Sequence, residues 1–142
     1  MILDSSAVCA IVLKEAEALA YSNAASEAES VRMAAPTFVE AAMVIDGKGR
    51  PELTRSFDEV LDWLHVEIAP FTERQARLAR EAFRDFGRGS GHRARLNLGD
   101  CFAYALAKDV GEPLLYKGDD FVHTDVRAVF PRGYVEGVSP RP

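Results

Sequence analysis

Short apolar runs alternate with longer segments of helical periodicity along this 142-residue chain. The apolar runs predict strands at residues 1–3, 31–35, 66–69 and 113–116, with a last edge strand at 128–130. The other segments predict helices at residues 5–13, 16–26, 36–46, 51–64, 72–86 and 100–108. This alternation is typical of an α/β protein with a mostly parallel sheet. The length fits a single domain over residues 1–142, and only residues 139–142 look like a disordered tail.

Local signals define several helix ends and faces. Pro36 opens the third helix and Gly47 ends it, while Thr72 and Gln75 form a capping box for the fifth. The fourth helix has one apolar stripe, formed by Leu53, Phe57, Val60, Leu61 and Leu64. In the fifth, we expect inward-facing residues at Ala76, Ala79, Phe83 and Phe86. The segment 100–108 is apolar almost all round and is therefore expected to be buried.

Net charge, hydrophobic runs and cysteines limit the classes of protein to which this chain can belong. The formal net charge of −5 argues against a protein whose whole surface binds nucleic acid. No signal peptide is apparent, and no run is long enough to span a bilayer. Cys9 and Cys101 fall in apolar helical segments without metal-type spacing, so we expect reduced, packed thiols in a cytoplasmic protein.

Acidic residues stand in comparable places on distant segments. Asp4 ends the first strand, where ligands collect in α/β proteins. Glu40 lies inside an apolar helix, where an uncompensated carboxylate is costly. Asp100 begins a buried helix, with Asn97 as a polar neighbour. Asp119 and Asp120 follow the strand at 113–116. These positions indicate a shared carboxylate site.

Each acid also has a simpler structural interpretation. Asp4 can cap the first helix, although Ser5 and Ser6 could do so and leave it free. Glu40 can point to solvent, and Asp100 can stabilise a helix dipole while Asn97 or Gly99 caps. Asp119 and Asp120 also suit a turn.

Converging carboxylates would repel one another, and one would take up a proton unless a cation lay between them. Oxygen ligands without histidine or thiolate favour Mg²⁺ or Mn²⁺ over Zn²⁺. His65, His92 and His123 have no metal-binding spacing. A bound divalent ion of this kind can activate water for attack on phosphorus. The residues therefore indicate metal-dependent phosphoryl chemistry.

Four segments together resemble PIN-domain ribonucleases, in particular the VapC toxins of VapBC toxin–antitoxin systems. They are ILDSSA at 2–7, FVE at 38–40, LNLGDCFAYALA at 96–107 and LLYKGDDF at 114–121. The resemblance runs nearly end to end. It implies a three-layer α/β/α fold with four to five mostly parallel strands, and a Mg²⁺- or Mn²⁺-dependent endoribonuclease toxin. It also implies a homodimer inhibited by a VapB-like antitoxin.

Carried onto this chain, the family's catalytic acids fall on Asp4, Glu40 and Asp100, with a fourth at Asp119 or Asp120. The choice between these two stays open, because many relatives place an acid or asparagine where this chain has Gly118. Asp120, directly before Phe121, is slightly favoured. The resemblance makes Asp4 and Asp100 the principal metal ligands, with Ser6 supporting the site. Our hypothesis for the reaction is that a metal-activated water displaces the 3′ oxygen of single-stranded or looped RNA, which leaves a 5′-phosphate and a 3′-hydroxyl.

A local excess of basic residues interrupts the acidic composition. Several cations are candidates for holding the RNA backbone, although a solvated loop explains them equally well: Arg84, Arg88, Arg93, Arg95 and Lys117. The partner hypothesis adds an apolar groove over residues 16–26 and 36–46 that holds an antitoxin helix, with an antitoxin arginine reaching the acids.

Two other functions are compatible with the residues. A metal-dependent phosphatase can also begin with a strand that ends on aspartate, but the haloacid-dehalogenase type needs a second acid where this chain has Ser6. A non-catalytic module could use its acids to bind a basic partner peptide. Metal-dependent RNA cleavage would indicate the nuclease, and turnover of small phosphate esters alone would indicate the phosphatase. Neither activity would indicate the binding module.

Overall fold

The computed structural model describes residues 1–131, so the predicted tail at 139–142 lies outside the described residues. Its four strands are β1 (Ile2–Leu3), β2 (Arg32–Ala34), β3 (Glu67–Ala69) and β4 (Leu114–Leu115). They form one parallel sheet in the order β3-β2-β1-β4. The predicted α/β fold with a parallel sheet is therefore confirmed.

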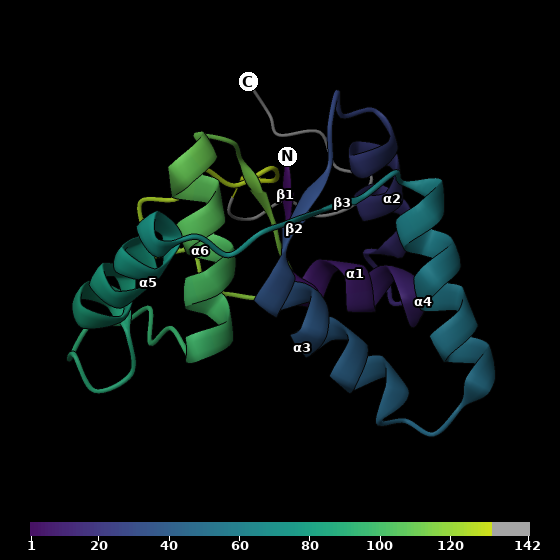
Figure 1. Ribbon diagram of the computed structural model, residues 1–142, viewed down its shortest axis with the longest axis horizontal. Coiled ribbons are helices and arrows are strands. Elements are labelled where there is room, and N and C mark those ends of the chain that lie inside the picture. Colours follow the sequence, from purple (N-terminus) through teal and green to yellow (C-terminus); the bar gives the residue numbers. More distant parts are fainter. Residues whose placement is uncertain (132–142) are drawn as a thin grey trace.

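Within residues 1–131, six helices flank this sheet (Figure 1). They are α1 (Ser5–Val12), α2 (Ala18–Ser26), α3 (Ala35–Asp46), α4 (Pro51–Trp63), α5 (Glu73–Phe86) and α6 (Leu98–Val110). In the described part of the chain, no helix combines the length and apolar character needed to cross a membrane.

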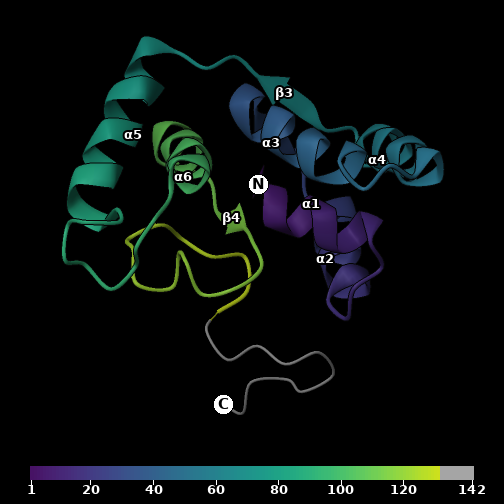
Figure 2. The ribbon, with the colours of Figure 1, turned by 90° about the horizontal axis from the view of Figure 1, so that it is seen from below.

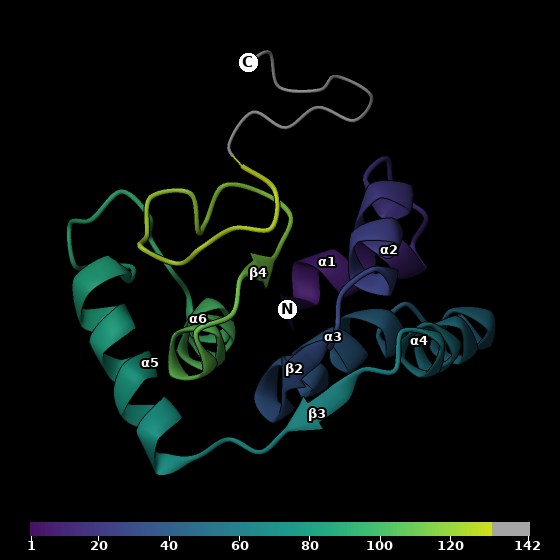
Figure 3. The ribbon, with the colours of Figure 1, turned by 90° about the horizontal axis from the view of Figure 1, so that it is seen from above.

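The short strands divide the core into two layers, because successive strand side chains point to opposite faces. Leu3, Met33 and Leu115 pack into a cluster with residues of α1 to α4. Ile2, Ala34 and Leu114 point the other way, into a cluster with α5 and α6. This alternation produces the three-layer arrangement seen in Figures 1 and 3.

Both cysteines are free and buried, Cys9 in the first cluster and Cys101 in the second, as predicted. The predicted stripe of α4 is also confirmed, since Phe57 and Leu64 are buried and Leu53, Val60 and Leu61 pack against the first cluster.

Two sequence predictions fail in detail. The expected edge strand at 128–130 is a single parallel bridge between Ala128 and Leu114. The inward face of α5 is also different, since Ala76 and Phe83 are exposed. Gln75 is buried in their place, because its Nε2 donates to Asp109 Oδ2 of α6 at 3.1 Å. A polar side chain can face the core when it has such a partner.

The capping box predicted for α5 is half present. The Thr72 hydroxyl accepts from Gln75 N at 3.2 Å. The Gln75 side chain, however, is directed to α6 rather than back to Thr72. The reciprocal bond of the predicted box is therefore replaced by a contact between two helices.

Candidate functional site

Parallel strands place all their carboxyl ends at one edge of the sheet. Asp4 follows β1 directly, and its backbone N–H donates to the carbonyl of Leu115 at the end of β4. The helix α3, which carries Glu40, starts directly after β2. Seen from below, α1, α3 and α6 lie around the centre of the molecule (Figure 2). The predicted acids from separate segments therefore come to the same edge.

Asp4 is 3% exposed, and its two carboxylate oxygens differ in their hydrogen bonding. Oδ2 accepts from Ser6 N at 3.0 Å and from Ser6 Oγ at 2.5 Å, so Asp4 is the N-cap of α1. This corrects the idea that the serines cap the helix and leave Asp4 free. Oδ1 is buried without a hydrogen-bond partner among the described residues. One oxygen thus serves the fold, and the other remains available for a ligand.

The hydroxyl of Ser6 connects Asp4 to β4. Ser6 Oγ donates to Asp4 and accepts from the backbone N–H of Lys117 at 3.0 Å. Lys117 Nζ in turn pairs with Glu15 and, at 3.1 Å, with Glu17 in the turn between α1 and α2. The Ser6 hydroxyl thus links the segment after β4 to the start of α1.

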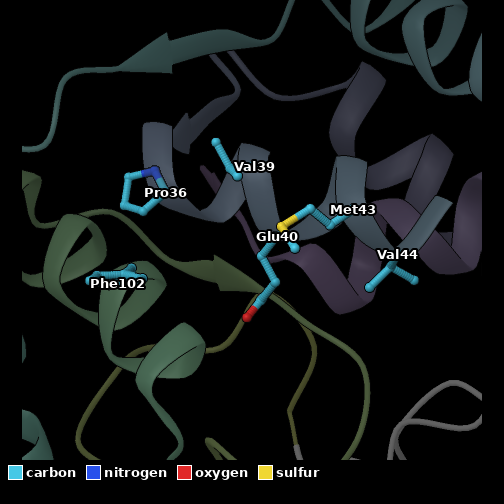
Figure 4. A pocket seen from close by; sticks show the side chains of 6 residues that line it. All are labelled: Pro36, Val39, Glu40, Met43, Val44 and Phe102. Atoms are coloured by element: carbon cyan, nitrogen blue, oxygen red, sulfur yellow. The ribbon is translucent and has the colours of Figure 1, made fainter. Parts of the chain in front are cut away.

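Glu40 lies between the first turns of two other helices. Its Oε1 accepts from Ser5 Oγ of α1 at 2.5 Å. On its other side is Gly99 of α6, where an added Cβ would lie 2.6 Å from Glu40 Cδ and closer still to Oε2. Figure 4 shows the Glu40 side chain extending from α3 into the space between the helices, beside Phe102 of α6. Ser5 and Gly99 were not selected from the sequence.

Asp100 is 9% exposed and shares the start of α6 with Asn97. Asn97 Oδ1 accepts from Asp100 N at 2.8 Å, and Asp100 Oδ2 accepts from Asn97 N at 2.9 Å. This reciprocal capping box shows that Asp100 does support the helix start, as its simpler interpretation proposed. The capping box uses Oδ2 of Asp100, and Oδ1 of the same carboxylate takes no part in it.

The pKa values record how strongly these acids are confined. Burial is the main reason that the pKa of Asp4 rises from 3.8 to about 6, and the charge of Glu40 adds to it against the Ser6 bonds. Burial also raises the pKa of Asp100 to about 7, against the Asn97 bond. The charges of Asp120, Asp4 and Glu40 raise it further. The charge of Glu40 thus acts on both buried aspartates, and the charge of Asp4 makes ionisation of Asp100 less favourable.

Asp119 and Asp120 are both exposed but act on different groups. Asp120 raises the pKa of Asp100, whereas Asp119 raises that of Tyr116. Both follow Gly118, whose φ of 93° is a conformation that glycine favours. Of the two, Asp120 is therefore the one whose charge acts on Asp100.

Among the described residues, Asp4, Glu40 and Asp100 form no ion pair with lysine or arginine. Within the same residues, no three histidine, cysteine, aspartate or glutamate side chains form a ready-made metal-binding group. Asp4 and Glu40 each direct one oxygen to a serine hydroxyl. In the described part of the chain, the second oxygen of Asp4 keeps no such partner, and the charges of Asp4 and Glu40 both act on Asp100.

The predicted RNA-binding cations fall into two groups. Arg84 pairs with the neighbouring Asp85 at 2.8 Å, and Lys117 is held by Glu15 and Glu17. By contrast, the loop between α5 and α6 carries three exposed arginines: Arg88, Arg93 and Arg95. A bridge between Gly87 and Leu96 closes this loop directly before Asn97.

Comparison with known proteins places this arrangement in a family. A model of the PIN domain matches residues 1–127. The chain belongs to the PIN-domain family. This PIN domain is 48% identical over 132 residues to ribonuclease VapC28 of Mycobacterium tuberculosis, covering 93% of this chain and 99% of the relative.

Two further relatives agree. Ribonuclease VapC42 of Mycobacterium tuberculosis is 48% identical to this PIN domain over 127 residues, which cover 89% of this chain and 97% of the relative. Ribonuclease VapC30 of the same species is 42% identical over 133 residues, with 91% and 98% covered. Within the PIN-domain family, the chain is a homologue of the VapC ribonucleases. Family membership also argues against the phosphatase interpretation.

Proposed function

We propose that this protein is the toxin of a type II toxin–antitoxin system, an endoribonuclease that hydrolyses RNA phosphodiester bonds with Mg²⁺ or Mn²⁺. The observation that carries the proposal is the buried Oδ1 of Asp4, unpartnered within residues 1–131, among acids from separate segments, whose charges raise the pKa of Asp100. Relatives named ribonucleases, aligned over nearly their full length, support the same chemistry.

The residues present fit a divalent cation. The partnerless buried Oδ1 of Asp4 and the raised pKa of Asp100 are the features that a nearby positive charge would relieve. Asp4 and Asp100 would hold the ion, and Glu40 and Asp120 would complete the negative surroundings. When bound, such an ion would lower the pKa of a water molecule and stabilise negative charge on the phosphate.

The chain's own contacts prepare this site. Ser6 holds Asp4 in one orientation, and Asn97 does the same for Asp100, so neither carboxylate has to be ordered when RNA binds. Fixing groups before the reaction lowers the entropic cost of reaching the transition state.

Incubation of the purified protein with 5′-labelled single-stranded RNA tests the activity. We expect cleavage that requires Mg²⁺ or Mn²⁺, stops with EDTA, and gives products with a 5′-phosphate and a 3′-hydroxyl. Hydrolysis of small phosphate esters without RNA cleavage would favour a phosphatase. Activity toward neither substrate, under conditions in which VapC28 cuts RNA, would leave only a partner-binding module.

The exposed arginines of the loop before α6 are proposed to hold the RNA backbone. Replacing Arg88 and Arg93 with glutamate should weaken RNA binding and reduce its salt dependence. Each lost phosphate contact lowers the slope of log K against log salt by about 0.7 for single strands. Fluorescence anisotropy at several salt concentrations measures this slope.

A matched control changes Arg50 and Arg55 to glutamate on the exposed start of α4, with the same change in net charge. This control should lower the affinity for RNA slightly, because it adds negative charge at a distance from the loop. The slope of log K against log salt should stay that of the wild type. Equal slopes for wild type and the Arg88/Arg93 variant would remove the loop from the account.

A homodimer is proposed through the outer face of α3. This face exposes Val39, Met43 and Val44 by 52%, 69% and 46%, and they line a groove with Pro36, Glu40 and Phe102 (Figure 4). Contiguous exposed apolar side chains mark interaction surfaces. Light scattering of wild type and Met43→Asp tests the dimer, and a wild-type mass of one chain contradicts it.

The second proposed partner is a VapB-like antitoxin in the same cytoplasmic compartment. The antitoxin groove was predicted over residues 16–26 and 36–46, which correspond to α2 and α3. In the structure α1 packs against both of these helices. The groove in Figure 4 lies instead between α3 and α6. Co-purification with the product of an adjacent small open reading frame tests the partnership. Harmless expression of the chain alone would contradict it.

A further inference from the structure

Gly99 is placed where a side chain would occupy the position of the Glu40 carboxylate. A Cβ built on Gly99 would lie 2.6 Å from Glu40 Cδ and 2.9 Å from Oε1, and nearer still to Oε2. All three atoms belong to the end of one flexible side chain. Gly99 is also absent from the residues with positive φ, so its backbone conformation does not itself require glycine. The missing Cβ therefore matters for space.

The opposite side of the same carboxylate is fixed by α1. Ser5 Oγ donates to Glu40 Oε1 at 2.5 Å, across 35 positions of the sequence. Glu40 is thus confined between a hydroxyl of α1 and the bare backbone of α6. A carboxylate that met a methyl group on the α6 side would have to move away from Gly99, and its bond with Ser5 would be disturbed.

We infer that Gly99 is a positioning residue, whose missing side chain allows the Glu40 carboxylate to lie between α1 and α6. The consequence for metal binding rests on the function proposed above, but the positioning itself does not. Gly99 would act through Glu40 and would not itself touch substrate. Ser5 would set the same carboxylate from the other side.

The test is Gly99→Ala, compared with Glu40→Ala and the double variant. Alanine is a better helix former than glycine, so the melting temperature should stay equal or rise. Affinity for Mn²⁺, measured by calorimetry, should fall about tenfold, the scale of losses when a metal site's supporting residue is changed. In the Glu40→Ala background, Gly99→Ala should cost no further affinity.

Leu98→Ala serves as the matched control, since Leu98 is the preceding residue and its side chain is 66% exposed. It should bind Mn²⁺ like wild type. A Gly99→Ala variant with wild-type affinity would overturn the inference, as would an equal loss with and without Glu40. If wild type itself bound no Mn²⁺, the proposed function would fail. The crystal structure of Gly99→Ala would still decide the inference, because an undisturbed Ser5–Glu40 bond would refute it.

Discussion

Replacing Asp4 with asparagine is expected to reduce RNA cleavage at least about 100-fold while leaving the protein equally or more stable at pH 8. Asparagine caps helices as well as aspartate, so the bond from Ser6 N is kept. The substitution removes a buried charge whose pKa is raised from 3.8 to about 6, which corresponds to about 3 kcal/mol at high pH. Burying an unpaired amide offsets about 1–2 kcal/mol of this gain.

The expected net change is therefore an increase of a few degrees in melting temperature, measured by calorimetry without metal. Asp58→Asn on the exposed surface of α4 makes the same change in charge and should alter neither activity nor melting temperature. Loss of cleavage together with loss of folded protein would show that Asp4 acts only as a helix cap. Full cleavage by Asp4→Asn would exclude it from the metal site.

The stabilisation by divalent ions should depend strongly on pH. The folded-state pKa values of Asp4 and Asp100, about 6 and about 7, both lie above the ordinary 3.8. Between these limits the folded state binds more protons than the unfolded state, so these two groups make stability fall as pH rises from about 4 through 7. Below pH 4 both states are protonated and the effect disappears. Above pH 7 both carboxylates are ionised, and the full loss of stability from their burial is present.

Mg²⁺ that binds the ionised pair should therefore raise the melting temperature more at pH 8 than at pH 5. An ion at 100 times its Kd contributes about 2.7 kcal/mol. Thermal unfolding across this pH range, with and without 10 mM Mg²⁺, measures the difference. The variant with Asp4→Asn and Asp100→Asn isolates the two groups and should show neither their pH dependence nor the Mg²⁺ effect. A Mg²⁺ effect of equal size at both pH values would contradict this coupling.

The features predicted well from sequence are those that depend on local pattern. The position of Asp4 follows from a strand that ends on an acid before a helix, and the turn at Gly47 from a helix end. Asp100 could be selected because the helix that follows it is apolar almost all round, although its bond to Asn97 N does not follow from that pattern. Parallel pairing then brings such strand ends together without further information.

The features that were missed depend on partners far along the chain. Ser5 and Gly99 matter only through Glu40, which is 35 and 59 positions away from them, so no local pattern reveals either role. The buried face of α5 was predicted wrongly for the same reason, since Gln75 Nε2 donates to Asp109 of the next helix. The two glutamate partners of Lys117, which lie about 100 positions away, likewise follow from no local pattern.

Soaking crystals with Mn²⁺ at pH 8 and recording anomalous scattering tests the account most directly. We expect one strong peak in contact with carboxylate oxygens of both Asp4 and Asp100, and none in the Asp4→Asn variant under the same conditions. A site without a peak in crystals that bind Mn²⁺ elsewhere, with Asp4 and Asp100 still directed only to Ser6 and Asn97, would contradict the shared carboxylate site.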